Sequence, residues 1–348
     1  MAGILEVAKA AGVSASTVSN VLNGRDARMR PETKARVLAA IDKLDYTPNA
    51  AAQQLKSGQI KTIGLICPSV ANPFWGAVAH YVERAAVKRN YKVLIGNAER
   101  DVAAEAHYAE MLLGSGVRGV ILSSAPMSFE HLRSLVDKGL LVGSFDRRSE
   151  GADELVSCSV SVDQELGGRL ATQHLIGLGH RRIAFLSGPI KTTSRLGRLA
   201  GMKTALARAG VAFDPDLVWQ GGGVAGFGDT EGLELGRNGI RELLSRDDPP
   251  TAAIAVNDMY ALGAYAGARD LGYSIPGDLS VVGFDDIVVS EVVQPPLTTV
   301  RQPVSAMASK IVATLIDQIE GTFPPPEVAH ASIAVQLIVR ASTAAPRR

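Results

Sequence analysis

The sequence predicts a small all-helical head followed by a larger two-lobed α/β body. Three observations lead to this fold class: three short amphipathic patterns within residues 1–48, a series of β-rich runs separated by helical stretches, and a restart of that series after Asp163. Alternating strands and helices predict parallel sheets built from right-handed βαβ units. We place the head at 1–48, a hinge helix and linker at 49–61 and the body at 62–340. Lobe 1 is expected at about 62–162 and 291–322, and lobe 2 at about 163–290 and 323–340.

The composition is that of a folded protein in a reducing compartment. The 348 residues are 46% hydrophobic and 20% charged. No apolar run reaches the ~18 residues of a membrane helix, and no secretion signal is visible, so we expect a cytoplasmic protein with no membrane partner. Cys67 and Cys158 lie far apart and near no histidine cluster. We therefore expect no disulfide, no metal site and no cofactor.

Charge is distributed unevenly along the chain. The formal net charge is only +1, but residues 1–61 contain nine Lys or Arg against five Asp or Glu, and the remainder contains 27 against 30. A basic head on a slightly acidic body indicates that the head meets a polyanion such as DNA.

The first two helical patterns have the spacing of a helix-turn-helix. Ala8 is small where two helices must cross closely, Gly12 permits a tight turn with positive φ, and Val18 fills the gap between the helices. A third helix begins at Pro31, a residue favoured at a first helical position. Such a motif places its second helix in the DNA major groove, where small hydroxyl side chains reach phosphates and base edges. The alternative, an ordinary helical hairpin with a serine cap, explains neither the polar face nor the basic charge.

The segments "EVAKAAGVSASTVSNVLNG" and "RPETKARVLAAIDKLDYTPNAAAQQL" resemble the head of the lactose/galactose repressor (LacI/GalR) family of bacterial transcription regulators. The resemblance continues through nearly the whole chain. It implies a periplasmic-binding-protein-like body and a homodimer or higher oligomer. By position, the base-reading residues of the family fall on Ala15, Ser16 and Asn20, and its phosphate contacts on Thr17 and Ser19. The predicted DNA-binding set is Ser14, Ala15, Ser16, Thr17, Ser19, Asn20, Asn23, Asn49 and Leu55.

The hinge "TPNAAAQQLKSG" is predicted to be a short helix capped by Asn49. The resemblance implies that this helix forms on DNA and inserts Leu55 between base pairs of the minor groove; a plain linker with helical propensity is the alternative. The chain departs from the family pattern at Gly3, where a threonine cap is usual, at Asp45, where glycine is usual, and at Gln53, which weakens a phosphate contact.

Ligands of open α/β sheets bind at the carboxyl ends of strands. The residues that follow the predicted strands combine aromatic rings with carboxylates, arginines and serines, a set that suits a sugar. Phe74 and Trp75 could instead be core residues, and Asp258 and Asp285 could be helix caps. The resemblance points most clearly to Arg198 and Asp285 as an effector clamp. The predicted effector-binding set is Phe74, Trp75, Ser124, Asp146, Arg147, Ser194, Arg198, Asp258 and Asp285.

We therefore expect a DNA-binding repressor, not an enzyme, whose affinity for double-stranded operator DNA is controlled by a small metabolite, expected to be a sugar. A purine corepressor is the alternative within the same family. The run "GGGVAG", Gly221 to Gly226, matches a dinucleotide-binding fingerprint, but a dehydrogenase leaves the head unexplained. A sugar-binding transport protein shares the two-lobed body, yet it has no helix-turn-helix.

Overall fold

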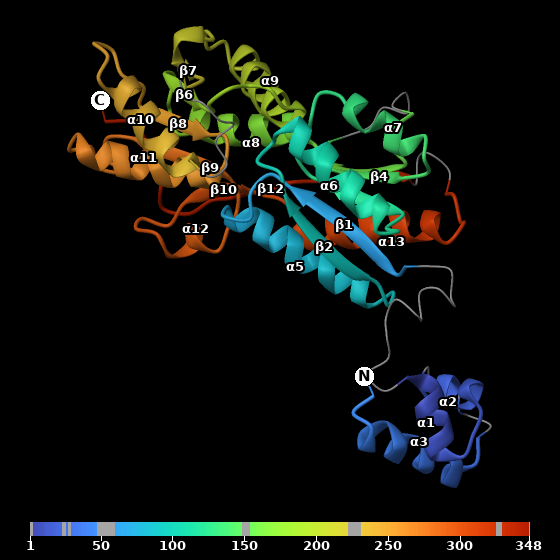
Figure 1. The fold of residues 1–348 in the computed structure, drawn as a ribbon. Helices are drawn as coiled ribbons and strands as arrows, with labels where there is room; N and C mark the ends of the chain where they lie inside the picture. The colour runs from blue at the N-terminus through green and yellow to red at the C-terminus, as the bar shows by residue number, and fades with distance from the viewer. Residues whose placement is uncertain are drawn as a thin grey trace. The chain divides into compact units, whose positions relative to one another are not determined.

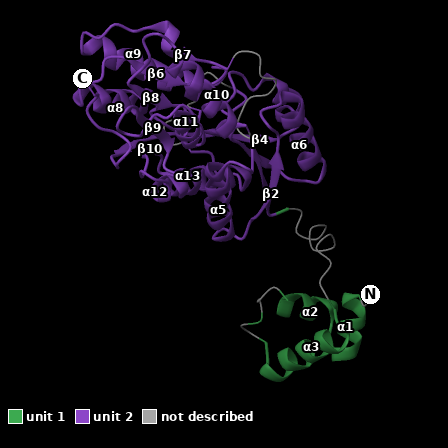
Figure 2. Ribbon diagram, turned by 90° about the vertical axis from the view of Figure 1, so that its left-hand side faces the viewer, with its two compact units in different colours: residues 1–60 green, residues 61–348 purple. Residues whose placement is uncertain are grey.

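The structure is a computed structural model that describes residues 3–22, 26, 29–46, 60–147, 154–221, 231–324 and 329–347. The chain forms two compact units, residues 1–60 and 61–348 (Figure 2). Each unit is described by itself. Within the described ranges, no helix combines the length and the apolar character needed to cross a membrane.

The described residues of unit 1 form three helices around a small apolar core. Its helices are α1 (Ile4–Ala11), α2 (Ala15–Leu22) and α3 (Pro31–Lys43) (Figure 1). Gly12 has a φ of 61° at the turn between α1 and α2, which confirms the tight turn predicted there. Val7, Val18 and Val37 are fully buried between the helices, so Val18 fills the gap between them as predicted.

Two departures from the family pattern are accommodated locally. The backbone N–H of Gly3 donates to the Glu6 carboxylate at 2.8 Å, so α1 begins with a capped first turn although Gly3 has no side chain. Asp45 has a φ of 44° just after α3. Aspartate adopts this left-handed conformation more readily than most residues, so it replaces the usual glycine.

Lobe 1 of unit 2 is an all-parallel sheet covered by helices on both faces (Figure 1). Its spatial order is β11-β5-β4-β3-β1-β2. Leu65 of β1 packs on one face, with α5 and α13, and its neighbour Ile66 packs on the other, with α6, because successive strand residues point to opposite faces. The strands are β1 (Thr62–Cys67), β2 (Lys92–Asn97), β3 (Gly119–Leu122), β4 (Leu141–Phe145), β5 (Cys158–Val162) and β11 (His330–Ile333). The helices are α5 (Pro73–Val87), α6 (Val102–Gly114), η1 (Glu130–Leu132), α7 (Arg133–Val136) and α13 (Val304–Ile319).

Lobe 2 repeats this plan in the order β12-β10-β9-β8-β6-β7, and only β12 runs antiparallel to its neighbour. The helix pairs α8–α9 and α10–α11 cover its two faces. The strands are β6 (Ile183–Leu186), β7 (Val218–Trp219), β8 (Ala252–Ala255), β9 (Ser280–Asp285), β10 (Thr298–Arg301) and β12 (Gln336–Ile338). The helices are α8 (Gln164–Gly177), α9 (Thr193–Arg208), η2 (Pro215–Leu217), α10 (Gly232–Leu244), α11 (Asp258–Asp270) and α12 (Val289–Val292).

The chain crosses between the lobes three times, after β5, after β10 and after β11. The predicted lobe boundary near residue 290 was wrong, because β10 pairs with β9 and keeps lobe 2 intact as far as Arg301. The boundary at 323 was wrong for the same kind of reason, since β11 pairs with β5 in lobe 1. These short strands carry no local pattern that says which sheet they join.

A close backbone approach fixes α9 against α8. A Cβ atom at Gly168 would lie 2.0 Å from the carbonyl oxygen of Arg198, and a Cβ at Gly201 would lie equally close to the carbonyl oxygen of Glu165. Only glycine permits this spacing. The position of Arg198 therefore depends on two glycines, one on each helix.

Candidate functional site

The N-terminal half of α2 presents a small polar surface. The Ser14 hydroxyl accepts from the Thr17 backbone N–H at 3.1 Å and lies 2.7 Å from the Ser16 hydroxyl, so Ser14 serves as the helix cap. Ser16 and Asn20 are exposed one turn apart, and Ala15, Thr17 and Ser19 are half-buried around them. The free N–H groups of a helix N-terminus also attract phosphate.

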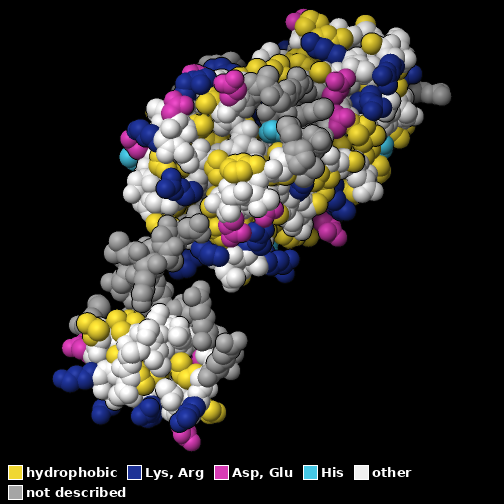
Figure 3. Space-filling view, turned by 90° about the vertical axis from the view of Figure 1, so that its right-hand side faces the viewer, with side chains coloured by type: hydrophobic (Ala, Val, Ile, Leu, Met, Phe, Trp, Pro, Cys, Tyr) yellow, Lys and Arg dark blue, Asp and Glu magenta, His cyan; other side chains and the backbone are white. Residues whose placement is uncertain are grey.

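The head carries more basic than acidic side chains, nine against five in residues 1–61. In Figure 3, Lys and Arg side chains with a few Asp or Glu lie along the border of the visible face of unit 1, and both signs of charge are scattered over the visible face of unit 2. Of the other residues predicted to contact DNA, Asn23, Asn49 and Leu55 lie outside the described residues.

A polar cavity lies in unit 2 where the strand ends of both lobes meet. Residues from lobe 1, from lobe 2 and from the crossover after β10 line it. The free space between them measures about 30 Å³, which can hold ordered water but is far below the roughly 300–1,000 Å³ of a ligand pocket. The lining residues are Asn72, Phe74, Trp75, Arg100, Asp146, Ser194, Arg195, Arg198, Val256, Asn257, Asp285 and Gln302.

Gln164 hydrogen-bonds to two residues that line this cavity, one from each lobe. It is the first residue of α8, immediately after the first crossover. Its side-chain N–H donates to the Asp146 carboxylate of lobe 1, and its side-chain oxygen accepts from Arg198 Nε of lobe 2 at 2.7 Å. One amide therefore holds a carboxylate and a guanidinium that come from opposite lobes.

Arg198 is the centre of the cluster. Its guanidinium carbon lies 3.5 Å from the centre of the Phe284 ring, and its Nη1 donates to the Val256 carbonyl. Asp285 accepts from Gln302 Nε2 at 2.8 Å. Because Gln302 lies on the second crossover, a second amide ties a cleft carboxylate to a segment between the lobes.

Burial dominates the electrostatics of the cluster. It raises the pKa of Asp146 to about 6, against the opposing pull of Arg198 and Arg100. It raises the pKa of Asp285 well above its ordinary value, again against the attraction of Arg198. Burial also lowers the pKa of the Arg198 guanidinium, and Asp285 and Asp146 oppose that shift. Such strongly perturbed groups gathered in one cavity are typical of a binding site.

Helix ends and aromatic rings complete the walls. Asn72 caps α5 and Asn257 caps α11, and each side chain accepts from a backbone N–H of its helix. Two positive helix ends therefore face the cavity. The Phe74 and Trp75 rings meet edge to face with centroids 4.8 Å apart, and both rings are almost fully buried.

Six of the nine residues predicted to bind effector line this cavity: Phe74, Trp75, Asp146, Ser194, Arg198 and Asp285. The other three lie elsewhere. Ser124 lines a neighbouring cavity, and the Arg147 guanidinium lies 4.7 Å from the centre of the Phe129 ring.

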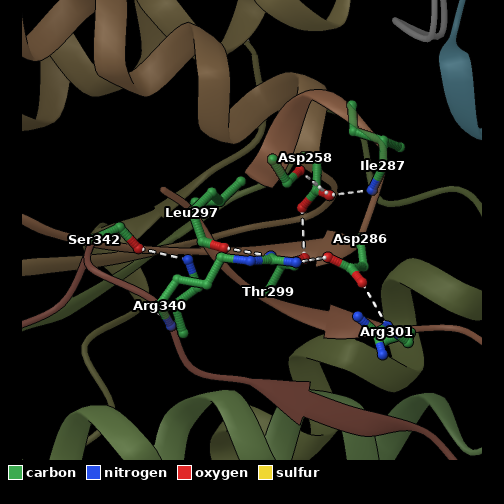
Figure 4. Close-up of polar contacts among 10 residues, drawn as sticks. Asp258, Asp286, Ile287, Leu297, Thr299, Arg301, Arg340 and Ser342 are labelled. Atoms are coloured by element: carbon green, nitrogen blue, oxygen red, sulfur yellow. Dashed lines mark hydrogen bonds and ion pairs between the residues drawn. The ribbon is translucent and has the colours of Figure 1, made fainter. Parts of the chain in front are cut away.

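Asp258 does not line the cavity. Its carboxylate is fully buried and accepts from the Ile287 backbone N–H, the Ser290 hydroxyl and the Thr299 hydroxyl (Figure 4). These bonds use both of its oxygens. The structure therefore corrects the predicted role of Asp258: it ties the start of α11 to α12 and β10.

Its neighbour in space, Asp286, forms a second structural node. Asp286 points between two arginines in Figure 4, with 2.5 Å to Arg301 Nε and 2.7 Å to Arg340 Nη2. Arg301 is the last residue of β10, so this node fixes the strand immediately before the second crossover.

Sequence reasoning missed several lining residues, above all Arg100, Arg195, Asn257 and Gln302. Arg100 lies three residues beyond β2, and Asn257 two residues beyond β8. The strand-end rule that identified Asp146 could have found both. Gln302 gave no such signal, because the β10 run that precedes it was not recognised as a strand.

A helix-turn-helix unit joined to a two-lobed body with a cavity between the lobes defines a class: DNA-binding regulators controlled by a ligand. Comparisons with known proteins agree. Residues 3–49 match the family described as bacterial regulatory proteins, lacI family, and residues 172–343 match the periplasmic binding protein-like domain.

Individual relatives extend over nearly the whole chain. The HTH-type transcriptional repressor PurR of Histophilus somni (strain 129Pt) is 32% identical over 345 residues, covering 98% of this chain and 99% of the relative. The ribose operon repressor of Haemophilus influenzae (strain ATCC 51907 / DSM 11121 / KW20 / Rd) is 34% identical over 321 residues, or 92% of each chain. The crystal structure of the lac repressor dimer bound to operator and the anti-inducer ONPF aligns over 99% of each chain at 29% identity, with a TM-score of 0.82.

The chain belongs to the LacI family. It is a DNA-binding transcriptional repressor regulated by a small-molecule effector. These relatives are regulators rather than enzymes, so the dehydrogenase hypothesis based on "GGGVAG" finds no support; apart from Gly221, that run lies outside the described residues.

Proposed function

We propose that the effector is a sugar bound in the cavity between the lobes. The observation that carries this proposal is the placement of Asp146 and Asp285 on opposite lobes, both interacting with Arg198. Sugar hydroxyls donate and accept at once, so alternating carboxylates and guanidinium groups suit them. The buried Gln302 also keeps a side-chain oxygen that has no hydrogen-bond partner among the described residues, which a ligand hydroxyl would satisfy.

A purine is the second candidate. The 32% identity to a PurR over 98% of this chain favours it. A purine base presents two flat faces for stacking and hydrogen-bonds only around its edge, whereas this cavity brings carboxylate acceptors from both lobes. The same ligand screen separates the two candidates.

We further propose that the repressor acts as a two-fold dimer on a near-palindromic operator. Strand β2 is the edge of the lobe 1 sheet, and Leu94 and Ile95 on it are about half exposed. An apolar edge strand of this kind favours association with another copy. Ser16 and Asn20 would then read bases in each half-site, residues 1–48 acting as the DNA-binding domain and 49–61 as the hinge.

Coupling between effector and operator would act through the angle between the lobes. The 30 Å³ of free space admits a sugar only if the lobes separate or lining side chains move. Gln164 follows the first crossover and Gln302 lies on the second, and their side chains donate hydrogen bonds to Asp146 and Asp285. A ligand that replaces those bonds would therefore favour another arrangement of the lobes. It shifts the population between the two arrangements only as far as it binds one more tightly than the other.

A thermal-shift screen of the full-length protein against neutral sugars and purine bases tests the effector class. A ligand bound only to the folded state raises the melting temperature by mass action. Sugars should raise it and purine bases should not; the reverse result would transfer the assignment to the purine. Operator DNA selected from a random pool then tests the DNA proposal, with a chain lacking residues 1–58 as the control that must not bind.

A further inference from the structure

A second cavity of about 390 Å³ adjoins the first in unit 2. Its lining comes from the start of α6, the loop after β3, η1 and the loop after β6, so both lobes contribute. Arg100 lines both cavities, and its Nη1 donates to the Ser124 carbonyl at 2.5 Å. One guanidinium group therefore stands between them. The volume falls within the range of ligand pockets.

The walls of this second cavity combine an apolar surface with buried polar groups. Val102 and Met127 on its lining are 53% and 55% exposed, so they offer an apolar face to a ligand. Glu105 is only 2% exposed, with its Oε2 3.0 Å from His131 Nε2. The Ser124 hydroxyl is buried and has no hydrogen-bond partner among the described residues, so it is available to a ligand.

The charges on the lining are balanced. Arg100 and Lys191 on the lining are opposed by Glu105 and Glu130. Glu130 also pairs with Arg133 at 2.6 Å, and Glu105 lies 3.0 Å from His131. A phosphate placed here would meet two carboxylates as well as two cations. The lining therefore lacks the excess of positive charge that a phosphate site needs. The cavity therefore suits a neutral group with an apolar face and a few hydroxyls.

The two lobes also touch at this place. The Thr193 backbone N–H of α9 donates to the Ala125 carbonyl of the loop after β3, at 3.4 Å. A ligand that reaches from the first cavity into the second would lie beside this contact and hold both lobes at once.

We propose that the second cavity binds the second unit of a two-unit effector, a neutral disaccharide or comparable glycoside whose first unit contacts Arg198 and Asp285. This inference rests on the proposed sugar function and narrows its ligand class. Phosphorylated monosaccharides are excluded by the charge balance, and single rings leave the second cavity unused.

The test uses the full-length protein and a panel of neutral disaccharides, the methyl glycosides of their single units, and the 6-phosphates of those units. Thermal shift identifies binders, and titration calorimetry measures their affinities. A neutral two-unit compound should bind at least about tenfold more tightly than either of its halves, because it adds contacts without a second loss of ligand freedom.

Two tryptophan variants form a matched pair. Met127→Trp fills the second cavity and should weaken the two-unit compound about tenfold while leaving the methyl glycoside unchanged. Met111, also on an exposed surface (51%), lines neither cavity, so Met111→Trp should change neither affinity. Because both side chains are exposed, neither substitution threatens the fold.

The outcomes separate this inference from the proposed function. If single units bind as tightly as two-unit compounds, if the 6-phosphates bind more tightly, or if Met127→Trp behaves like Met111→Trp, the inference is wrong while the sugar function stands. If no neutral or phosphorylated sugar binds, both fall. Arg198→Ala should weaken one-unit and two-unit compounds alike, by roughly 5- to 150-fold.

Discussion

Replacing Gly168 by alanine should move the helix that carries Arg198. The new Cβ would lie 2.0 Å from the Arg198 carbonyl oxygen, whereas carbon–oxygen contacts between packed helices are about 3.3 Å or longer. Helix α9 must therefore retreat by about 1 Å or more from α8. The Arg198 carbonyl belongs to the backbone of α9 and cannot rotate away as a flexible side chain would. The strain is therefore shared by the α8–α9 pair.

The magnitude follows from two opposing effects. Overpacking in a tight core costs about 3 kcal/mol at the upper end of its usual range. Alanine returns about 1 kcal/mol of helix propensity relative to glycine. The net loss of about 2 kcal/mol lowers the melting temperature of unit 2 (residues 61–348) by about 3 °C.

Gly177 supplies the matched control. It is the last residue of the same helix, and a Cβ there meets nothing within 4 Å. Gly177→Ala should leave the melting temperature unchanged or raise it slightly. Calorimetric unfolding of both variants, followed by titration with the cognate effector, tests the reasoning. If Gly168→Ala has the same melting temperature as Gly177→Ala and binds effector normally, the close contact between α8 and α9 does not position Arg198.

Three further predictions concern protons and DNA. Burial raises the pKa of Asp146 to about 6, while a free aspartate titrates near 3.9; the folded chain therefore takes up a proton as pH falls from 6 to 4, which stabilises it, and this gain is lost as pH rises through 6. Denaturant unfolding between pH 4 and 6 should show that the free energy of unfolding depends less on pH in Asp146→Asn than in the wild type. An equal pH dependence in both proteins would contradict the raised pKa of Asp146. Asn20→Ala should reduce preference at particular operator positions by roughly 1–3 kcal/mol; a uniform loss at every sequence in a competition assay would make Asn20 a phosphate contact. Leu55→Ala should reduce specific binding and DNA bending but spare effector affinity, and equal bending by both proteins would show that Leu55 is only part of a linker.

The elements that the sequence predicted well have strong local patterns. The runs "TIGLIC" and "SVVGFD" are apolar, bounded by polar residues, and buried on both faces, as central strands of parallel sheets are. Strand β5, "CSVSV", escaped recognition because its serines look like a loop, although Ser159 and Ser161 are buried. The crossovers escaped for a different reason, since each depends on which sheet a short strand joins: β10 pairs with β9, 16 residues earlier, and β11 pairs with β5, 171 residues earlier.

The candidate site divides along similar lines. Asp146 and Asp285 were predictable because they carry charge at the end of a strand, whereas Arg198, twelve residues beyond β6, was predicted mainly from the family resemblance. Asp258 satisfies the same rule, yet its carboxylate points toward α12 instead, and the direction of a side chain cannot be read from its position in the sequence. Gln302 is neutral and follows an unrecognised strand, so its link to Asp285 is visible only in three dimensions.

Operator affinity measured with and without the cognate effector tests the central claim most directly. In Arg198→Ala and Asp285→Ala, effector binding should weaken by about 1–3 kcal/mol, because a buried polar group loses its partner. The head is untouched, so both variants should bind operator like the wild type when no effector is present. At effector concentrations that switch the wild type, neither variant should respond. If both variants respond with wild-type midpoints, the effector binds elsewhere, and the cavity between the lobes is not the regulatory site.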